Sequence, residues 1–198
     1  MPGSEVKGAW FMTARRYILQ DYGEEIFARY VEAAPEESRD ALSEPVVSRW
    51  YPETVMRDAL ESFFREVSHR DADKFTSAME RCTVLGTHWF LQVLVSVTTP
   101  RYLLRLLPTA LRQLRRGSVR LVVDVRENAA TLRFTHHPFA DHPCYRLATP
   151  AIMRSTLRLC VGQAARATLT HYDETTHVVE VSWADYQPPS ARGSSSPS

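Results

Sequence analysis

The chain has 198 residues, of which 44% are hydrophobic and 24% are charged, and it contains three cysteines. This length and composition indicate one ordinary globular unit with a full hydrophobic core, and they exclude fibrous, disulfide-stapled and mostly disordered classes. No apolar run is long enough to cross a bilayer, and the N-terminus lacks the apolar core of a secretion signal, so the sequence predicts a cytoplasmic protein with no membrane span.

The charge is divided unevenly, although the formal net charge is only +1. Residues 1–100 carry 11 basic and 16 acidic side chains, whereas residues 101–172 carry 12 arginines against three acids. Such asymmetry is typical either of a docking face for an acidic partner, an anionic ligand or nucleic acid, or of acidic and basic layers that face solvent or each other. Both interpretations stay open at this stage.

Helical patterns fill the first half of the chain. Apolar residues at helical spacing predict helices over about 10–22 and 24–34, divided at Gly23, and another from Pro52 to about Val67. A long helix is expected from a cap at Asp71 or Asp73 to about Val97. Its last turns, WFLQVLVSV, are apolar almost all round, which predicts that they form the centre of the fold.

The next helix is expected to begin at Thr99-Pro100 and to end at Gly117. Pro108 inside it is expected to kink the helix or divide it in two, because proline lacks a backbone donor and clashes with the preceding turn. No nucleic-acid recognition motif accompanies the arginines of this helix, so nucleic acid is not a favoured partner. Four of them lie near one helical face and are the candidate contacts for a protein partner: Arg101, Arg105, Arg112 and Arg116.

From Ser118 onward apolar residues alternate with polar ones, which predicts strands. We expect a hairpin around Glu127-Asn128, then a helix from Thr149 to about Gly162, then strands over about 164–172 and 176–183. The predicted fold class is α+β, with an N-terminal helical half packed on a four-stranded antiparallel sheet and a strand-strand-helix-strand-strand C-terminal half.

The organisation that follows from these patterns is a single α+β domain over residues 1–186. Residues 1–117 form its helical half and residues 118–186 its sheet half. Residues 187–198, QPPSARGSSSPS, are expected to be a disordered tail.

One loop, HHPFADHPC, gathers potential metal ligands and nucleophiles around Asp141: His136, His137, His142 and Cys144. Their spacing matches no zinc-finger or metalloprotease pattern, and neighbours in a strand point to opposite faces. The favoured interpretation is a polar loop, with no catalytic residue, no bound metal and no cofactor. A metal-binding protein or an enzyme that uses this loop stays as the alternative.

Large apolar side chains near the long helix are the candidate walls of a pocket for an apolar ligand between the helices and the sheet. A packed core with no pocket is the other interpretation. The pocket candidates are Trp50, Tyr51, Leu85, His88, Trp89, Phe90 and Val93.

Several short motifs together carry a family resemblance: VKGAWF, DYG, WYP, TPRYLLRLLP and a final VSW. Over about residues 5–183 the chain resembles an uncharacterised myxobacterial paralogous family of proteins close to this length. That family is distantly similar to the haem-NO-binding / 4-vinyl-reductase ligand-binding superfamily. The resemblance implies an α+β fold whose cavity, between a helical half and an antiparallel sheet, serves small-molecule sensing.

The resemblance implies the fold and not a haem. Haem-binding relatives carry a proximal histidine in the helix before the sheet and a Tyr-x-Ser-x-Arg motif, and residues 99–117 contain no histidine and no such motif follows. The favoured function is therefore a non-catalytic binding or regulatory module that senses an apolar small ligand or docks a protein partner. A structural assembly component, and a homodimer, stay open.

Overall fold

The computed structural model describes residues 3–86 and 99–184. The apolar end of the predicted long helix and the predicted disordered tail lie outside these residues. Within them, no helix is sufficiently long and apolar to cross a membrane.

The helical half consists of α1 (Ala9–Glu32), α2 (Glu36–Ser43), α3 (Glu53–Ser62), a π-helical turn (Phe63–Val67) and α4 (Ala72–Gly86). α1 changes direction at Gly23, where φ is 83°, so the predicted division falls at the right residue. Asp71 caps α4, because its carboxylate accepts from the amides of Asp73 and Lys74 at 2.9 and 3.0 Å.

A small sheet that the sequence does not predict joins three distant parts of the chain. Strands β1 (Glu5–Lys7), β2 (Trp50–Pro52) and β3 (Arg115–Arg116) pair antiparallel in the order β2-β1-β3. β3 takes up the two arginines that were expected to end a helix. This sheet fixes the first residues of α3 beside the end of α6.

α6 (Pro100–Leu114) begins as predicted, with Pro100 in the first turn and the Thr99 hydroxyl accepting from the Tyr102 amide at 3.3 Å. It continues through Pro108 as one helix, so the expected division does not occur. Leu103 and Leu104, just before this proline, are 3% and 1% exposed. Burial of these side chains holds the helix in place despite the missing donor.

α7 (Pro143–Val161) begins earlier than Thr149, where the sequence pattern placed its start. Its start signal is His142, whose Nδ1 accepts from the Cys144 amide at 3.3 Å, followed by Pro143 at the first helical position. Pro150, next to the expected start, lies inside the helix. The helix ends at Gly162, with φ of 64°, and a short 3-10 turn (Gly162–Ala164) follows.

The main sheet confirms the predicted fold class. Its strands β4 (Arg120–Val125), β5 (Ala129–Thr135), β6 (Arg166–Tyr172) and β7 (His177–Ser182) are antiparallel in the order β4-β5-β7-β6. The expected hairpin joins β4 to β5, with Leu121 opposite Phe134.

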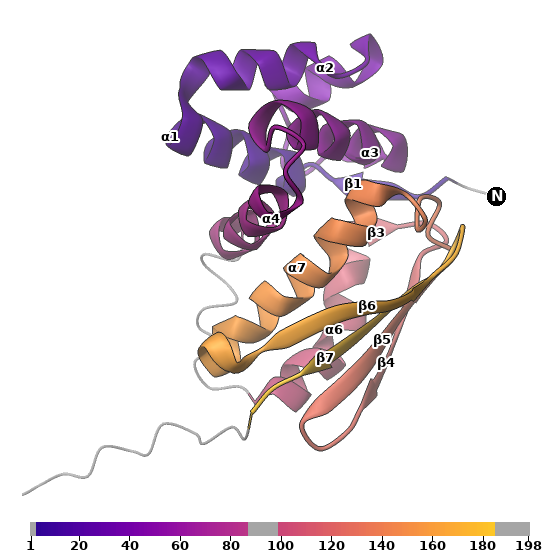
Figure 1. Cartoon of the computed structure of the whole chain (residues 1–198). Coiled ribbons are helices and arrows are strands. Elements are labelled where there is room, and N and C mark those ends of the chain that lie inside the picture. The colour runs from indigo at the N-terminus through magenta and orange to yellow at the C-terminus, as the bar shows by residue number, and fades with distance from the viewer. Residues whose placement is uncertain (1–2, 87–98, 185–198) are drawn as a thin grey trace, which may run out of the picture.

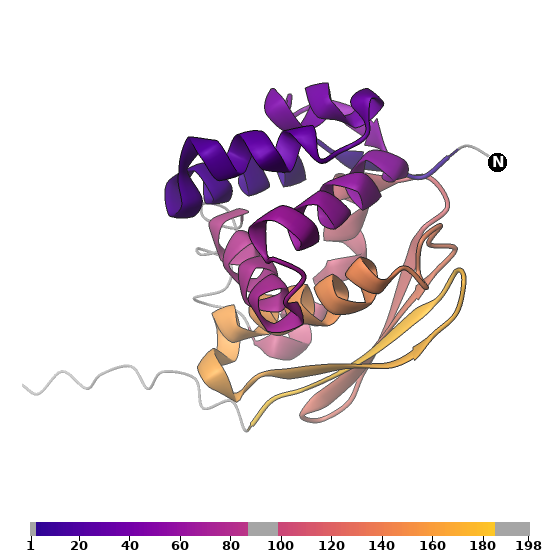
Figure 2. The same ribbon diagram turned by 45° about the horizontal axis from the view of Figure 1, so that its top comes forward.

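α7 is the middle layer of the molecule. α6 and α7 lie on one face of the main sheet, and the N-terminal helices lie on the other side of α7 (Figures 1 and 2). Tyr145 and Ala148 of α7 belong to the apolar core of the helical half, whereas Leu157 belongs to the core above the sheet. Residues of α7 therefore contact both halves, and a site between the halves must involve them.

Candidate functional site

A cavity of about 80 Å³ lies between the N-terminal helices and α7; we call it the helical cavity. Its walls are mostly apolar, and they come from α1, α3, α4 and α7 together with β3. The lining residues are Trp10, Phe11, Ala14, Tyr30, Met56, Ala59, Leu60, Phe63, Met79, Cys82, Thr83, Arg115, Tyr145, Ala148, Thr149 and Ile152.

A second cavity, of about 60 Å³, lies toward the main sheet; we call it the sheet cavity. It is more polar, because two histidines contribute to its wall. The lining residues are Trp10, Leu111, Arg115, Phe134, His137, Thr149, Ile152, Met153 and His177. Trp10, Arg115, Thr149 and Ile152 line both cavities, so the two spaces adjoin.

A buried ion pair forms part of this region. The Glu53 carboxylate, 3% exposed, lies 2.9 Å from the Arg115 guanidinium, 14% exposed. Tyr145 Oη donates to Glu53 Oε1 at 2.6 Å, and Ser4 Oγ donates to Oε2 at 3.2 Å. A buried charge needs such partners, because water no longer solvates it. β3 and the start of α3, joined through β1, bring these groups together.

His137 is held neutral beside this pair. Its Nε2 accepts from the Arg115 guanidinium at 2.5 Å, so the neutral ring carries its proton on Nδ1, which lies 3.3 Å from the Phe139 nitrogen. Burial lowers the pKa of His137 well below its usual value, and the positive charge of Arg115 lowers it further.

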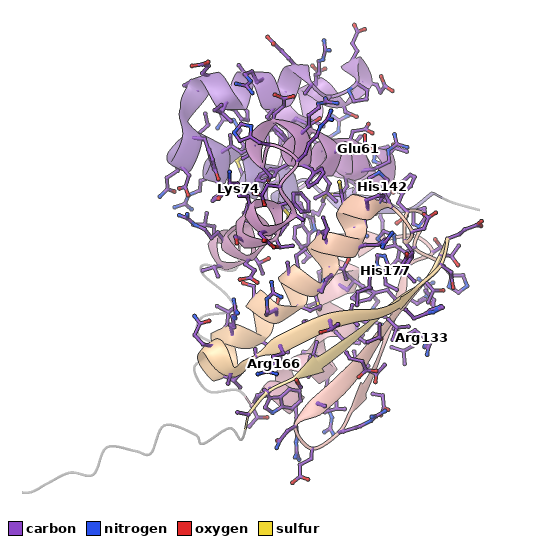
Figure 3. The ribbon with its side chains drawn as sticks, in the orientation of Figure 1. Glu61, Lys74, Arg133, His142, Arg166 and His177 are labelled. Carbon is purple, nitrogen blue, oxygen red and sulfur yellow. The ribbon has the colours of Figure 1, made fainter. Side chains whose placement is uncertain are left out.

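His177 lies beside His137 in the wall of the sheet cavity, with the two ring centroids 5.6 Å apart, at the start of β7 near α7 (Figure 3). Its Nε2 contacts the Ala140 carbonyl, and its Nδ1 lies 3.5 Å from the Thr149 hydroxyl. Burial lowers the pKa of His177. The neutral ring therefore donates to the carbonyl through Nε2 and accepts from Thr149 through Nδ1.

Trp10 carries a polar atom with no partner. Its Nε1 is fully buried and has no hydrogen-bond partner in the described part of the chain. Buried N–H groups are nearly always paired, because an unpaired one loses its hydrogen bonds to water without replacement. This atom belongs to a residue that lines both cavities.

The thiols of Cys82 and Cys144 offer no nucleophile. Burial raises the pKa of Cys82, in the wall of the helical cavity, and of Cys144, at the start of α7, to about 12. At neutral pH both groups are thiols, and it is the thiolate that attacks substrates or binds metals.

An open groove of about 520 Å³ lies on the surface between α1, α4 and α7. Arg81 pairs with Asp21 across it at 2.6 Å, and Arg158 pairs with Glu80 at 2.6 Å. Its charged side chains are thus largely neutralised by each other. The lining residues are Gln20, Asp21, Ser77, Glu80, Arg81, Val84, Leu85, Ser155, Arg158, Leu159 and Gln163.

Three of the predicted pocket residues, Trp50, Tyr51 and Leu85, lie in the described part of the chain, and they are not among the residues that line the two inner cavities. Trp50 lies in the small sheet between the side chains of Lys7 and Arg116, and Tyr51 packs edge-on against Phe11. Leu85 lines the open groove. The other four candidates, His88, Trp89, Phe90 and Val93, lie outside the described residues.

The four residues of the HHPFADHPC loop do not converge. His136 is exposed, His137 faces Arg115, and His142 lies 2.7 Å from Glu61 of α3 (Figure 3). Within residues 3–86 and 99–184, no group of three or more histidine, cysteine, aspartate or glutamate side chains is placed to hold a metal ion.

The predicted arginine face is exposed, although its members differ in their contacts. Arg116 lies in β3 and pairs with Glu5. Arg101 donates to the Glu127 carbonyl at 3.0 Å and Arg112 to the Thr109 hydroxyl at 3.1 Å. Along the described chain, no carboxylate pairs with Arg101, Arg105 or Arg112.

Sequence reasoning missed Glu53 and Tyr145 as parts of one site. Tyr145 and Glu53 are 92 positions apart, and the small sheet that positions them consists of strands of two or three residues. No local pattern marks such strands. The only signal in the sequence was a carboxylate directly after Pro52, which is an ordinary first residue of a helix.

No protein-family model matches the sequence, and no curated protein matches it closely. Solved structures do match the fold. An Fe(II) unliganded H-NOX protein from K. algicida is 13% identical, covers 90% of this chain and 97% of its own, and has a TM-score of 0.64. An H-NOX protein from S. oneidensis in the Fe(II) ligation state is 11% identical, covers 91% and 97%, and has a TM-score of 0.66.

A third match is an H-NOX from Shewanella woodyi in the Fe(II)CO ligation state, which is 12% identical, covers 89% of this chain and 94% of its own, and has a TM-score of 0.62. At these identities the likeness concerns the fold. The chain therefore has the fold of the H-NOX, or haem-NO-binding, proteins over nearly its whole length.

Proposed function

We propose that this protein is a non-catalytic regulatory module that binds a small, largely apolar ligand in the helical cavity. The observation that carries the proposal is the position of this cavity, whose walls come from the N-terminal helices, α7 and β3. A ligand there contacts both halves of the fold at once. Because a ligand stabilises the state that binds it, occupancy changes how firmly the halves are held together.

The described residues do not fit a haem. Cofactor sites typically measure about 300–1,000 Å³, and the helical cavity measures about 80 Å³. Both ring nitrogens of His137 and of His177 already face polar partners within the described protein. Arg115, the cation in the cavity wall, is already paired with Glu53. The proposal therefore concerns a ligand of a few heavy atoms.

An apolar space of this kind favours compact organic molecules. An engineered apolar cavity of about 150 Å³ stays dry and binds benzene, and the helical cavity, at about 80 Å³, is a smaller space of the same apolar kind. The sequence motifs support a finer placement in the myxobacterial paralogous family related to the 4-vinyl-reductase superfamily. That placement, and a cytoplasmic setting, stay predictions.

Cyclopentane is a suitable first probe, with binding followed by the melting temperature and by methyl NMR shifts. We expect shifts confined to the cavity wall, such as at Ala59, Ala148 and Ile152. At a free concentration ten times Kd, the protein should gain about 1.4 kcal/mol of stability.

Filling the cavity tests the location. Ala148→Leu adds three carbons at a wall position that is 2% exposed, and it should abolish both the thermal and the NMR response. Ala110→Leu, on the exposed face of α6, is the matched control and should bind cyclopentane as the unaltered protein does. An unaltered protein that shows no response to the probe, or an Ala148→Leu variant that binds equally well, would contradict the proposal.

Docking of an acidic protein surface on α6 is a second candidate function. It is favoured by the exposed Arg101, Arg105 and Arg112, which have no carboxylate partner among residues 3–86 and 99–184. Arg101 lies in the first turn of α6, where the helix dipole disfavours a cation, although its Nε donates to the Glu127 carbonyl at 3.0 Å.

A polyglutamate peptide is the probe for this surface. We expect binding that weakens with salt and is lost in Arg105→Glu/Arg112→Glu, whereas Arg29→Glu/Arg39→Glu, on the helical half, leaves it unchanged. Tighter binding of duplex DNA than of the peptide would instead identify a nucleic-acid surface. The oligomeric state of the same variants, measured by sedimentation, reports whether a second copy of the chain binds to this face of α6.

A further inference from the structure

The adjoining cavities differ in what they offer a ligand. The helical cavity is walled by apolar side chains, whereas the sheet cavity contains histidines, and Trp10 and Thr149 lie at the boundary. A ligand that extends from one to the other has an apolar body and a polar end. The groups at this boundary determine which kind of polar group the ligand can carry at that end.

Of the polar side chains that line both cavities, Arg115 and Thr149 have hydrogen-bond partners in the described residues, whereas Trp10 does not. Arg115 donates toward Glu53 and His137. The Thr149 hydroxyl donates to Nδ1 of His177, since Nε2 of that ring donates to a carbonyl. The Trp10 indole N–H has no acceptor in the described residues, although it is fully buried. The missing group is therefore an acceptor.

The charges at the boundary are balanced before any ligand enters. The Glu53 carboxylate neutralises the Arg115 guanidinium at 2.9 Å, and these side chains are only 3% and 14% exposed. A ligand carboxylate would add an uncompensated negative charge near Glu53, and burial of an unpaired charge is strongly unfavourable. An uncharged acceptor avoids this cost.

We propose that the ligand is a small neutral molecule with an apolar body and one hydrogen-bond acceptor, such as a ketone, that accepts from Trp10 Nε1 where the two cavities meet. This inference rests on the proposed function, because it concerns the same cavity. It adds the polar group of the ligand and the residue that recognises it. Trp10 thereby becomes a specificity-determining residue.

Three probes of matched shape test the inference. In 2-methyl-1-butene a methylene group replaces the carbonyl oxygen of 2-butanone, and in propionate a charged oxygen replaces one of its methyl groups. We expect 2-butanone to bind about 3- to 10-fold more tightly than the alkene, as the gain of one buried hydrogen bond predicts. Propionate should not saturate the site at concentrations at which 2-butanone does.

The Trp10 indole N–H resonance gives a second readout. It should move downfield with 2-butanone and stay nearly unchanged with the alkene. In Trp10→Phe the ketone and the alkene should bind alike, whereas Trp50→Phe, which removes an indole outside both cavities, should keep the preference. The binding of the alkene and of the ketone is also compared in the unaltered protein. This comparison tests the inference even if Trp10→Phe does not fold.

The outcomes separate the two proposals. If none of the probes binds, the proposed function fails. If the alkene binds as tightly as the ketone, the cavity is a ligand site but the acceptor inference is wrong. Propionate binding more tightly than 2-butanone would also overturn it, because it would show that the site prefers an anion.

Discussion

Among single residues, Glu53 is notable because it carries its charge in an almost fully buried position. It is 3% exposed and is held by Arg115, Tyr145 and Ser4. We expect Glu53→Gln to destabilise the protein by about 3–5 kcal/mol, because the Arg115 charge loses its partner while still buried. The free energy of unfolding in urea measures this loss.

The control for this prediction is an exposed pair on the same small sheet. Glu5 pairs with Arg116, and these side chains are 30% and 53% exposed. Solvent screens such a pair, so Glu5→Gln should cost at most about 1 kcal/mol. Similar losses of stability in Glu53→Gln and Glu5→Gln would show that burial does not determine how much the Glu53–Arg115 pair contributes to the free energy of unfolding.

At the level of elements, the small sheet depends on a glycine between β3 and β4. Gly117 has φ of 107°, and a Cβ there would lie 2.7 Å from the Gly3 carbonyl oxygen and 2.9 Å from Ser4 Cα. Gly162, after α7, has φ of 64°, but no neighbouring atom of the described residues lies within 4 Å of such a Cβ. Both glycines have a positive φ that strains other residues, but only at Gly117 would a Cβ atom meet close neighbours.

Gly117→Ala should therefore destabilise the protein clearly more than Gly162→Ala, for which strain alone predicts about 1–2 kcal/mol. The added methyl group must move β1, and with it Ser4, away from Arg115. Urea unfolding gives the two costs, and hydrogen exchange should be accelerated at the β1 amides only in Gly117→Ala. Equal costs with unchanged exchange would contradict the close approach of these strands.

The elements also show where sequence patterns suffice. Alternation predicted β4–β7, and the Thr99-Pro100 cap predicted the start of α6, because these signals are local. The start of α7 was misplaced, because Thr149-Pro150 has the same cap-and-proline pattern as His142-Pro143. Only packing against the helical half, through Tyr145 and Ala148, selects the earlier start.

For the whole molecule, the α+β arrangement could be predicted, but the candidate site could not. Trp10, Glu53, Arg115 and Tyr145 come from four separate elements, and each has an ordinary role in its own segment. Their shared function arises when α7 is placed between the two halves. Such contacts depend on the tertiary packing of the chain and leave no periodic trace in the sequence.

The two buried histidines connect this packing to pH. His137 follows β5 and His177 begins β7, and burial lowers the pKa of both rings in the folded protein. In the unfolded chain a histidine takes up a proton as the pH falls through about 6.5. Below that pH the unfolded state binds more protons, so the folded protein should lose stability as the pH falls, by at most about 1.4 kcal/mol per pH unit for each ring that stays neutral in the folded state.

Unfolding free energies between about pH 6.5 and 5 should therefore fall steeply, and His177→Gln should flatten the slope, since one of the two rings that resist protonation is gone. The groups that face His177 include Arg115 and Arg146, whose charges lower its pKa, and Asp141, whose charge raises it. His136→Gln, at an exposed position, should leave the slope as it is. Equal slopes in the unaltered protein and in His177→Gln would show that the core tolerates a charged ring at this position.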